Sequence, residues 1–284
     1  MKRDRKRFAY WRSFALVTGA ASGMGRVYAQ RLSALGYSLL LVDINATGLE
    51  ETAAVVKSEV TAISDWRKEF SGQFRIVTCV QDLSLVDAAA SVAAVADGGG
   101  CDVEVLVNNA GMFFFREISE VPQKYLSRMV MLHNHTPLML CREFVPRMKS
   151  RGRGYVLNIS SLAAWMPWPG VGMYGNTKRF IKGFSRSLRT ECRGTGVSVT
   201  SAYFGAVATD LFGLPPFYKR LAMRLGVMVT ADRAVDSALN AMFRRRKGTM
   251  PGLINHIFRP VMVLLPDSFL HWLYRKLEFA WTRF

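Results

Sequence analysis

The chain has 284 residues, a formal net charge of +17 and a mean hydropathy of +0.11. Because 50% of its residues are hydrophobic and 12% are aromatic, an intrinsically disordered chain is excluded. The basic charge favours an anionic partner, usually nucleic acid or a lipid surface, and the length fits one large domain or two small ones.

Apolar runs alternate with helical patterns along the chain. The run at residues 38–42, SLLLV, is apolar without alternation, as expected for a strand that is buried on both faces. Strands that alternate with helices indicate βαβ units, so we predict an α/β fold: a doubly wound, Rossmann-like parallel sheet with helices on both faces and a helical C-terminal extension. The predicted strands are Phe14–Thr18, Ser38–Val42, Phe74–Val80, Val103–Val107, Tyr155–Ile159 and Val197–Tyr203. The predicted helices are Gly23–Leu35, Ala46–Val60, Ser84–Ala96, Pro122–Ser150 with a bend at Pro137, and Val171–Arg193.

Cysteine and histidine spacing argues against a disulfide framework or a metal site. The four cysteines form no C-x-x-C pair, so we expect a reducing, cytoplasmic location. His133 and His135 are two residues apart, which places them on different faces of a helix, so we expect no bound metal. The basic N-terminus has no apolar segment before Ser13, and no run of about 18 apolar residues follows, so we expect neither a signal peptide nor a membrane-spanning helix.

A glycine-rich turn joins the first predicted strand to the first predicted helix. It reads TGAASGMG over residues 18–25, a G-x-x-x-G-x-G spacing that differs from the G-x-G-x-x-G of the general dinucleotide fingerprint. Glycines in such a turn let the backbone approach a pyrophosphate, whose charge the helix N-terminus stabilises. Any tight strand-to-helix turn also favours glycine, so this motif needs support from others.

Asp43 ends the second predicted strand, 18 residues after Gly25. An acidic residue about 20 residues beyond the glycine turn can accept a hydrogen bond from the ribose 2′-hydroxyl and repel a 2′-phosphate. The alternative is that Asp43 caps the turn before the next helix. Position 22 is serine and position 44 is isoleucine, which favours NAD over NADP, whereas Arg26 is close enough in sequence to leave NADP open.

Two further motifs carry candidate site residues. Asn108-Asn109-Ala110-Gly111 follows the fourth predicted strand, and Tyr174 and Lys178 share one face of a later predicted helix because they are four residues apart. An ammonium beside a phenol favours the phenolate and lowers its pKa from about 10 toward working pH, as a general acid/base requires. A Y-x-x-x-K spacing also arises by chance, with the tyrosine in the core and the lysine in solvent.

Taken together, these motifs resemble the short-chain dehydrogenase/reductase family over about residues 14–209. The family's glycine motif is met by Thr18, Gly19, Gly23 and Gly25, its Asn-Asn-Ala-Gly motif by residues 108–111, and its Tyr-x-x-x-Lys motif by Tyr174 and Lys178. Ser161, 13 residues before Tyr174, stands where the family has its serine, and Asn134 stands where it has its asparagine. The chain departs from the family's usual Pro-Gly pair after the sixth strand, since it has Phe204-Gly205 there.

The resemblance implies a nicotinamide cofactor and a role for each matched residue. Tyr174 would exchange a proton with the substrate oxygen, and Ser161 would hydrogen-bond that oxygen. Lys178 would bind the nicotinamide ribose and tune Tyr174, while Asn134 would support a water relay to Lys178. The expected cofactor is NAD, with NADP not excluded, held by Thr18, Gly19, Ser22, Gly23, Met24, Gly25, Asp43, Asp82, Leu83, Asn109, Ala110, Gly111, Tyr174, Lys178, Gly205, Val207 and Thr209.

Three aromatic and apolar stretches, at 113–115, 165–169 and 211–218, are expected from the resemblance to border the substrate pocket. None offers a polar cluster for a sugar or a carboxylate, which favours a lipophilic ketone or alcohol of steroid, fatty-acyl or sphingoid type. The alternative is that these stretches form core, lid packing or a subunit interface. The predicted substrate-binding residues are Phe113, Trp165, Trp168, Phe204 and Phe212.

The excess positive charge lies at the two ends of the chain. Residues 1–13 carry a net charge of +5 and residues 210–284 carry +7, against +5 for residues 14–209. Residues 267–284 combine an apolar helical stripe with basic neighbours, as does a helix that lies on an anionic membrane. The equal alternative is that the stripe packs on the domain or on a second subunit. The stripe comprises Phe269, Leu270, Leu273, Tyr274, Leu277, Trp281 and Phe284.

Four segments follow from these patterns. We predict a basic arm at 1–13, a dinucleotide-binding catalytic domain at 14–209, a substrate lid and helix of the same domain at 210–252, and an amphipathic extension at 253–284. The resemblance implies a homo-oligomer, and the absence of a nucleic-acid-binding signature predicts no nucleic-acid partner. The leading hypothesis is an enzyme that interconverts a lipophilic ketone and a secondary alcohol, at a membrane surface or in the cytoplasm. The alternative is a non-catalytic nucleotide sensor or scaffold, against which the complete set of Asn134, Ser161, Tyr174 and Lys178 argues.

Overall fold

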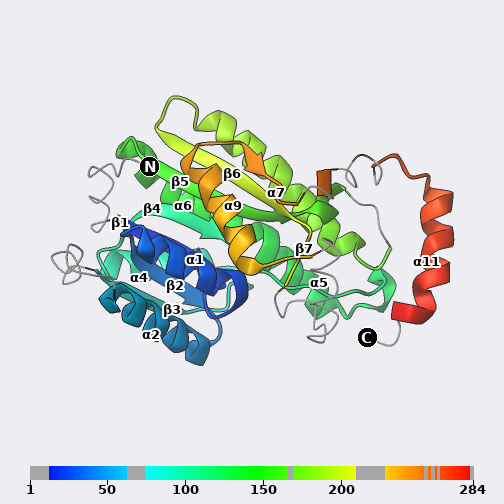
Figure 1. Cartoon of the computed structure of the whole chain (residues 1–284), viewed down its shortest axis with the longest axis horizontal. Coiled ribbons are helices and arrows are strands. Elements are labelled where there is room, and N and C mark those ends of the chain that lie inside the picture. Colours follow the sequence, from blue (N-terminus) through cyan, green and yellow to red (C-terminus); the bar gives the residue numbers. More distant parts are fainter. Residues whose placement is uncertain are drawn as a thin grey trace.

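Seven strands form one parallel sheet in the order β3-β2-β1-β4-β5-β6-β9 (Figure 1). The computed structural model describes residues 13–62, 74–165, 169–208, 228–252, 255–256, 260 and 263–281. The six predicted strands all occur, each within two residues of its predicted ends, and β9 was not predicted. The strands are β1 (Ser13–Thr18), β2 (Ser38–Asp43), β3 (Ile76–Val80), β4 (Asp102–Asn108), β5 (Gly154–Ser161), β6 (Val197–Phe204) and β9 (Gly248–Thr249).

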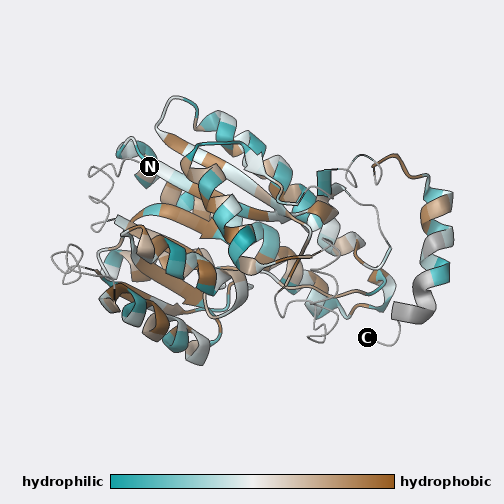
Figure 2. Ribbon diagram, viewed as in Figure 1, coloured by the Kyte–Doolittle hydropathy of each residue, from teal (hydrophilic) through white to brown (hydrophobic). Residues whose placement is uncertain are grey.

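Helices cover both faces of the sheet, which confirms the predicted doubly wound α/β fold. One layer comprises α1 (Gly23–Ala34), α2 (Ala46–Ala62) and α9 (Ala231–Phe243), and the other comprises α4 (Ala88–Gly98), α6 (Thr136–Ser150) and α7 (Gly172–Glu191). Successive side chains of β1 alternate between the layers, since Ala15 and Val17 face the first and Phe14 and Leu16 the second. Both faces are therefore buried, and the strands are apolar in Figure 2.

The helix predicted to begin at Ser84 begins at Ala88 instead. Asp82 explains the delay, because its Oδ1 accepts hydrogen bonds from the Ser84 backbone N–H at 2.9 Å and from the Ser84 hydroxyl at 2.6 Å. Such a local bond to an aspartate side chain stabilises a turn in competition with the first turn of a helix.

The long helix predicted over residues 122–150 contains a π-helical turn. It comprises α5 (Gln123–Val130), η3 (Met131–His135) and α6, with Pro137 in the first turn of α6. Pro137 has no N–H for the carbonyl oxygen of His133, four residues earlier, so the regular hydrogen-bond ladder is interrupted there. The irregularity therefore precedes the proline and carries His133 and Asn134.

Several shorter elements complete the described fold. Two 3-10 turns, η2 (Ile118–Glu120) and η4 (Leu162–Trp165), follow β4 and β5, and β7 (Ala206–Val207) pairs with β8 (Met228–Val229). The predicted arm up to residue 12, the stretch 211–218, Trp168 and Thr209 lie outside the described residues.

The C-terminal helix α11 (Asp267–Trp281) stands at one end of the molecule, away from β1, β2 and β3 (Figure 1). The Tyr274 hydroxyl donates a hydrogen bond of 2.6 Å to the Glu117 carboxylate, in the segment that follows β4. Leu270 is buried, whereas Phe269 is exposed, so the predicted stripe is divided between the protein and solvent. Trp272, next to the stripe, is also exposed. Within the described part of the chain, no helix is long and apolar enough to cross a membrane. The stripe residues whose side chains lie outside the described part are Leu273, Leu277, Trp281 and Phe284.

Candidate active site

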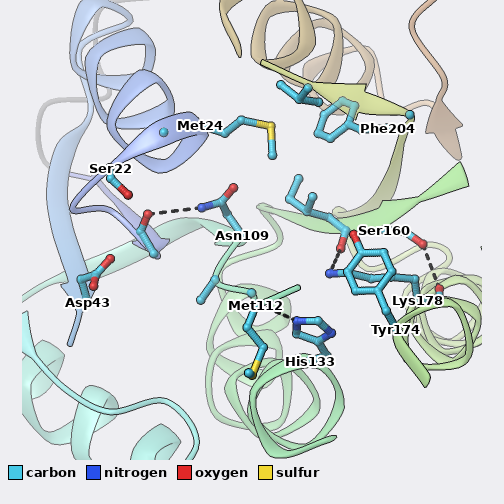
Figure 3. A pocket seen from close by; sticks show the side chains of 17 residues that line it. Ser22, Met24, Asp43, Asn109, Met112, His133, Ser160, Tyr174, Lys178 and Phe204 are labelled. Carbon is cyan, nitrogen blue, oxygen red and sulfur yellow. Dashed lines mark hydrogen bonds between the residues drawn. The ribbon is translucent and has the colours of Figure 1, made fainter. Parts of the chain in front are cut away.

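A cavity of about 420 Å³ opens where the carboxyl ends of β1, β2, β4, β5 and β6 meet (Figure 3). This is the point at which the sheet order reverses, between β1 and β4, and open α/β sheets bind ligands there. Thirteen predicted site residues line it: Gly19, Ser22, Gly23, Met24, Asp43, Asn109, Ala110, Gly111, Tyr174, Lys178, Phe204, Gly205 and Val207.

The glycine turn brings the backbone of β1 and α1 to the cavity. Gly19 and Gly23 have φ angles of +67° and +52°, which glycine adopts without strain. A Cβ atom on Gly25 would lie 1.8 Å from the Gly19 carbonyl oxygen, so a side chain there is excluded. The turn therefore leaves backbone at the N-terminus of α1, where a pyrophosphate can approach closely.

Thr18 joins the glycine turn to the Asn108–Gly111 motif. Its hydroxyl oxygen accepts the backbone N–H groups of Asn109 and Ala110, both at 3.0 Å, and the Asn109 amide donates to the Thr18 carbonyl at 2.9 Å. Thr18 and Gly25 do not line the cavity themselves. The Asn109 Oδ1 atom is buried without a hydrogen-bond partner, and the side chain extends among the residues that line the cavity (Figure 3). A ligand donor would satisfy that oxygen.

Asp43 reaches the cavity from the end of β2. Its carboxylate accepts the backbone N–H groups of Ala21 and Asn45, both at 3.0 Å, so its role in the turn coexists with a position at the cavity. Arg26, which was left open as a phosphate-binding cation, donates to the Glu51 carboxylate and the Ala21 carbonyl at 2.8 Å each. Its charge is therefore compensated by Glu51.

Tyr174 is buried at the start of α7, and its ring meets that of Phe113 edge-on at 5.1 Å. Burial raises the pKa of Tyr174 above its ordinary value, and a side-chain hydrogen bond with Ser161 opposes that rise. The expected lowering of this pKa by Lys178 is wrong for this structure, because desolvation of the phenol dominates. Ser161 itself donates to the Phe204 carbonyl at 3.2 Å, across the β5–β6 pair.

Lys178 is buried one helical turn after Tyr174. Its ammonium donates to the Ile159 carbonyl at 3.1 Å and lies 5.6 Å from the centre of the Tyr174 ring (Figure 3). Burial lowers the pKa of Lys178 to about 8. Asn134 does not line the cavity, and its amide donates to the Thr177 carbonyl at 2.9 Å, which attaches the π-helical turn to α7.

Other predicted residues lie away from the cavity. Trp165 packs on Tyr203 at 4.7 Å between ring centres, and the Lys182 ammonium lies 4.5 Å from the centre of the Trp165 ring. Trp165 was predicted to border the substrate pocket, but it does not line this cavity. Asp82 contacts Arg128 at 3.3 Å, and the Leu83 carbonyl accepts the Thr136 hydroxyl at 2.7 Å. Neither lines the cavity, and Phe212 lies outside the described residues.

Four residues line the cavity that the motifs did not predict: Met112, His133, Ile159 and Ser160. Met112 directly follows the Asn-Asn-Ala-Gly motif, and Ser160 precedes the predicted serine, so both could have been found by extending those motifs. His133 was considered only as a metal ligand, although it immediately precedes Asn134. Among the described residues, no group of three histidine, cysteine or acidic side chains could hold a metal ion.

These residues fit a nicotinamide dinucleotide. The cavity combines exposed backbone at a helix N-terminus, a carboxylate at the end of β2, an unsatisfied buried amide oxygen and a buried ammonium beside a phenol. Exposed backbone at a helix N-terminus suits a pyrophosphate, and a carboxylate at the end of the second strand suits a ribose hydroxyl.

Comparison with known proteins gives the same assignment. The sequence profile of the family described as short chain dehydrogenase matches residues 13–214. The very-long-chain 3-oxoacyl-CoA reductase-A of Danio rerio is 29% identical over 205 residues, which are 70% of this chain and 59% of that relative's length. The serine 3-dehydrogenase of Rhizobium radiobacter is 31% identical over 196 residues, 69% of this chain and 72% of the relative. A short-chain dehydrogenase from Sphingobium yanoikuyae, solved in complex with NADPH, has a TM-score of 0.72 and 25% identity, covering 90% of this chain and 97% of that one.

Proposed function

Because this chain belongs to the short chain dehydrogenase family, we propose that it is a nicotinamide-dependent oxidoreductase that interconverts a lipophilic ketone and a secondary alcohol. The observation that carries the proposal is that Tyr174 and Lys178 line the glycine-cradled cavity together, with Ser161, which does not line the cavity itself, hydrogen-bonded to Tyr174. A sensor or scaffold would need the cradle but not this set. The match spans 59% of the length of the Danio rerio relative, so that relative's name does not fix the activity of this chain.

In the proposed reaction the nicotinamide, when bound, supplies or accepts the hydride at the carbon of the carbonyl group. Tyr174 donates its phenolic proton to the carbonyl oxygen during reduction and takes it back during oxidation. Its raised pKa keeps that proton in place at neutral pH. To orient that oxygen, Ser161 would turn its one hydroxyl hydrogen from the Phe204 carbonyl to the substrate, and the Lys178 ammonium would supply positive charge where the phenolate develops.

We propose NAD(H) as the preferred cofactor. The Asp43 carboxylate lines the ribose side of the cavity, and a 2′-phosphate there would meet its negative charge. The pairing of Arg26 with Glu51 removes the cation that could have compensated the phosphate. The Sphingobium yanoikuyae protein was solved with NADPH. The proposed preference of this chain for NAD(H) therefore rests on Asp43 and Arg26 and is tested by substituting residues at this site.

The substrate side favours an apolar molecule. Phe113 packs on Tyr174 without lining the cavity itself, and Phe204 is buried in the cavity wall, in place of the proline that the family pattern led us to expect. The two relatives are named for a very-long-chain 3-oxoacyl-CoA and for serine, so their names do not decide the substrate class. The proposed class rests on the apolar side chains of Phe113 and Phe204. We therefore propose a fatty-acyl or steroid ketone.

The helix α11 supports a proposal about location. The rings of Phe269 and Trp272 lie 5.6 Å apart in a tilted arrangement, and the two residues are 42% and 53% exposed. Leu264 before them is 79% exposed. Arg275 and Lys276 are exposed beside this apolar face. We propose that the helix lies on an anionic membrane surface, with Tyr274 attaching it to the segment that continues from the cavity wall. The net charge of +17 complements such a surface.

The test is a panel of steroid ketones and long-chain 3-ketoacyl thioesters, each assayed with NADH and with NADPH, together with serine as the polar substrate, assayed for oxidation with NAD+ and with NADP+. We expect reduction of at least one lipophilic ketone at a kcat/KM at least roughly tenfold above the oxidation of serine. Turnover of serine alone would contradict the substrate class, and cofactor binding without turnover of any compound would favour the sensor.

A further inference from the structure

His133 is a buried imidazole that the reaction described above does not use. It is 1% exposed, lies in the π-helical turn η3 and borders the cavity beside Met112 (Figure 3). Its ring lies 5.7 Å from that of Tyr174, which it meets edge-on. Because the histidine lies this close to the proposed proton donor, it matters which of its ring nitrogens carries a hydrogen.

Hydrogen bonds on both ring nitrogens determine where that proton lies. Nε2 accepts the Met112 backbone N–H at 2.9 Å, so it carries no hydrogen. Nδ1 lies 2.9 Å from the Thr177 hydroxyl oxygen, and that hydroxyl donates its only hydrogen to the Tyr174 carbonyl at 2.7 Å. Thr177 must therefore accept from Nδ1–H. Both contacts select one neutral tautomer, protonated on Nδ1.

The surroundings keep this imidazole neutral. Burial and the Lys178 charge lower the pKa of His133 well below its ordinary value, and the Met112 N–H that donates to Nε2 stabilises the same neutral form. In the part of the chain described, the titratable groups that face it are Lys178 and Tyr174 on α7, while Gly111 and Met112 face it with backbone. On its own turn, His135 bonds instead to the Val86 carbonyl at 3.2 Å.

Gly111 shows how closely the imidazole and the ammonium flank the loop after β4. A Cβ atom on Gly111 would lie 3.1 Å from His133 Nε2 and 3.8 Å from Lys178 Nζ. The same loop carries Asn109, whose buried amide oxygen has no hydrogen-bond partner among the described residues. The histidine thus contacts the loop through Met112 and the first turn of α7 through Thr177.

We propose that His133 is a positioning residue of the proposed reductase: a neutral Nδ1–H imidazole that connects Met112 to the Thr177–Tyr174 turn and so fixes Tyr174 against the loop. This inference rests on the proposed function. Protonation would place an Nε2–H against the Met112 N–H and a second cation beside Lys178. Both effects would displace the loop or the helix turn and slow proton transfer, while the apolar substrate pocket would change little.

The test combines a spectroscopic and a kinetic readout on the full-length protein. Long-range proton–nitrogen NMR of the histidine-labelled chain reports the tautomer without any turnover, with the spectrum of His133→Asn used for assignment. We expect the Nδ1–H form and no titration between about pH 5.5 and 8. An Nε2–H form, or titration near the ordinary histidine range, would overturn the proposal.

The kinetic variants are His133→Phe, which keeps the ring volume, and Thr177→Val, which removes the hydroxyl in the middle of the connection. We expect each to lower kcat about tenfold or more, with KM for the ketone changed less than about threefold. His133→Asn, which can still donate to Thr177, should recover part of the rate. His135→Asn serves as the matched control and should behave as the wild type.

The outcomes separate this inference from the proposed function. Unchanged kcat in Thr177→Val, or in a folded His133→Phe, would overturn the positioning role while leaving the reductase intact. A wild type that reduces no ketone overturns the inference together with the proposed function, whatever tautomer the NMR spectrum shows. A wrong tautomer in an active wild type overturns the inference alone.

Discussion

The Lys178 ammonium lies 5.6 Å from the centre of the Tyr174 ring and is held at 3.1 Å by the carbonyl oxygen of Ile159. The two side chains are adjacent on α7, yet burial moves their pKa values in opposite directions, that of Tyr174 up and that of Lys178 down to about 8. The phenol is thereby a stable proton donor at neutral pH, and the lysine is the first of the pair to lose its proton as the pH rises.

This order predicts the alkaline limb of the pH profile. Carbonyl reduction needs the Tyr174 proton and the Lys178 charge, so kcat/KM should fall as the pH rises through about 8. The Lys178→Arg variant, whose side chain stays charged, should have a lower kcat/KM at neutral pH, but its kcat/KM should not fall as the pH rises through about 8. A limb near the same pH in both proteins would assign it to another group.

Stability should respond to the same lysine. Between about pH 8 and the ordinary lysine value of 10.5, the unfolded chain still binds the proton that folded Lys178 has released. The unfolded state then holds more protons, so this group makes the free energy of unfolding rise with pH across that window. Urea titrations of wild type and Lys178→Met at pH 8 and pH 10 should show this rise only in the wild type. An equal pH dependence in both would contradict the assignment.

The glycine cradle predicts a contrast between two alanine substitutions. In Gly25→Ala the added methyl group would meet the Gly19 carbonyl oxygen at 1.8 Å, so we expect loss of cofactor binding and destabilisation by several kcal/mol, about 3 or more. Gly183→Ala on α7 meets nothing within 4 Å and should stabilise the helix by about 0.5–1 kcal/mol. Calorimetric melting and cofactor titration measure both. Normal NAD(P)H binding by Gly25→Ala would refute the cradle.

Cofactor preference should depend on Asp43. Asp43→Ser removes the carboxylate from the ribose side and retains a short acceptor, so the ratio of kcat/KM for NADPH over NADH should rise about tenfold or more. Glu51→Gln, which frees Arg26 of its ion pair, should raise the ratio by a smaller factor. A ratio that does not move in Asp43→Ser would place the ribose elsewhere.

The exposed face of α11 predicts binding to lipid. Full-length protein should co-sediment with vesicles of phosphatidylcholine and phosphatidylglycerol, less strongly at high salt, and Phe269→Ala with Trp272→Ala should weaken binding about tenfold or more. The control is Leu85→Ala with Val86→Ala, an exposed apolar pair elsewhere on the surface. Equal loss in both double variants would remove the helix as the membrane contact.

The strands and the motif residues were predictable because they depend on local patterns. A run without alternation, such as Leu39–Val42, is typical of a strand covered on both faces. The glycine turn follows from backbone conformations that only glycine adopts without strain. Asp43 was found by its spacing and does line the cavity.

What the sequence could not provide depends on the environment in three dimensions. The direction of the Tyr174 pKa follows from burial, which Y-x-x-x-K spacing does not report. Trp165 lies near Ser161 in sequence but packs on Tyr203, a residue of the neighbouring strand. His133 was overlooked because its partners, Met112 and Thr177, come from two separate segments of the chain.

The most direct test of the account is reduction of the best lipophilic ketone by wild type and by Tyr174→Phe, followed through nicotinamide absorbance. We expect kcat to fall by roughly a thousandfold or more, while the Kd of the reduced cofactor stays within about threefold of the wild-type value. A Tyr174→Phe protein that binds cofactor and retains wild-type turnover would contradict the central claim that Tyr174 carries the proton.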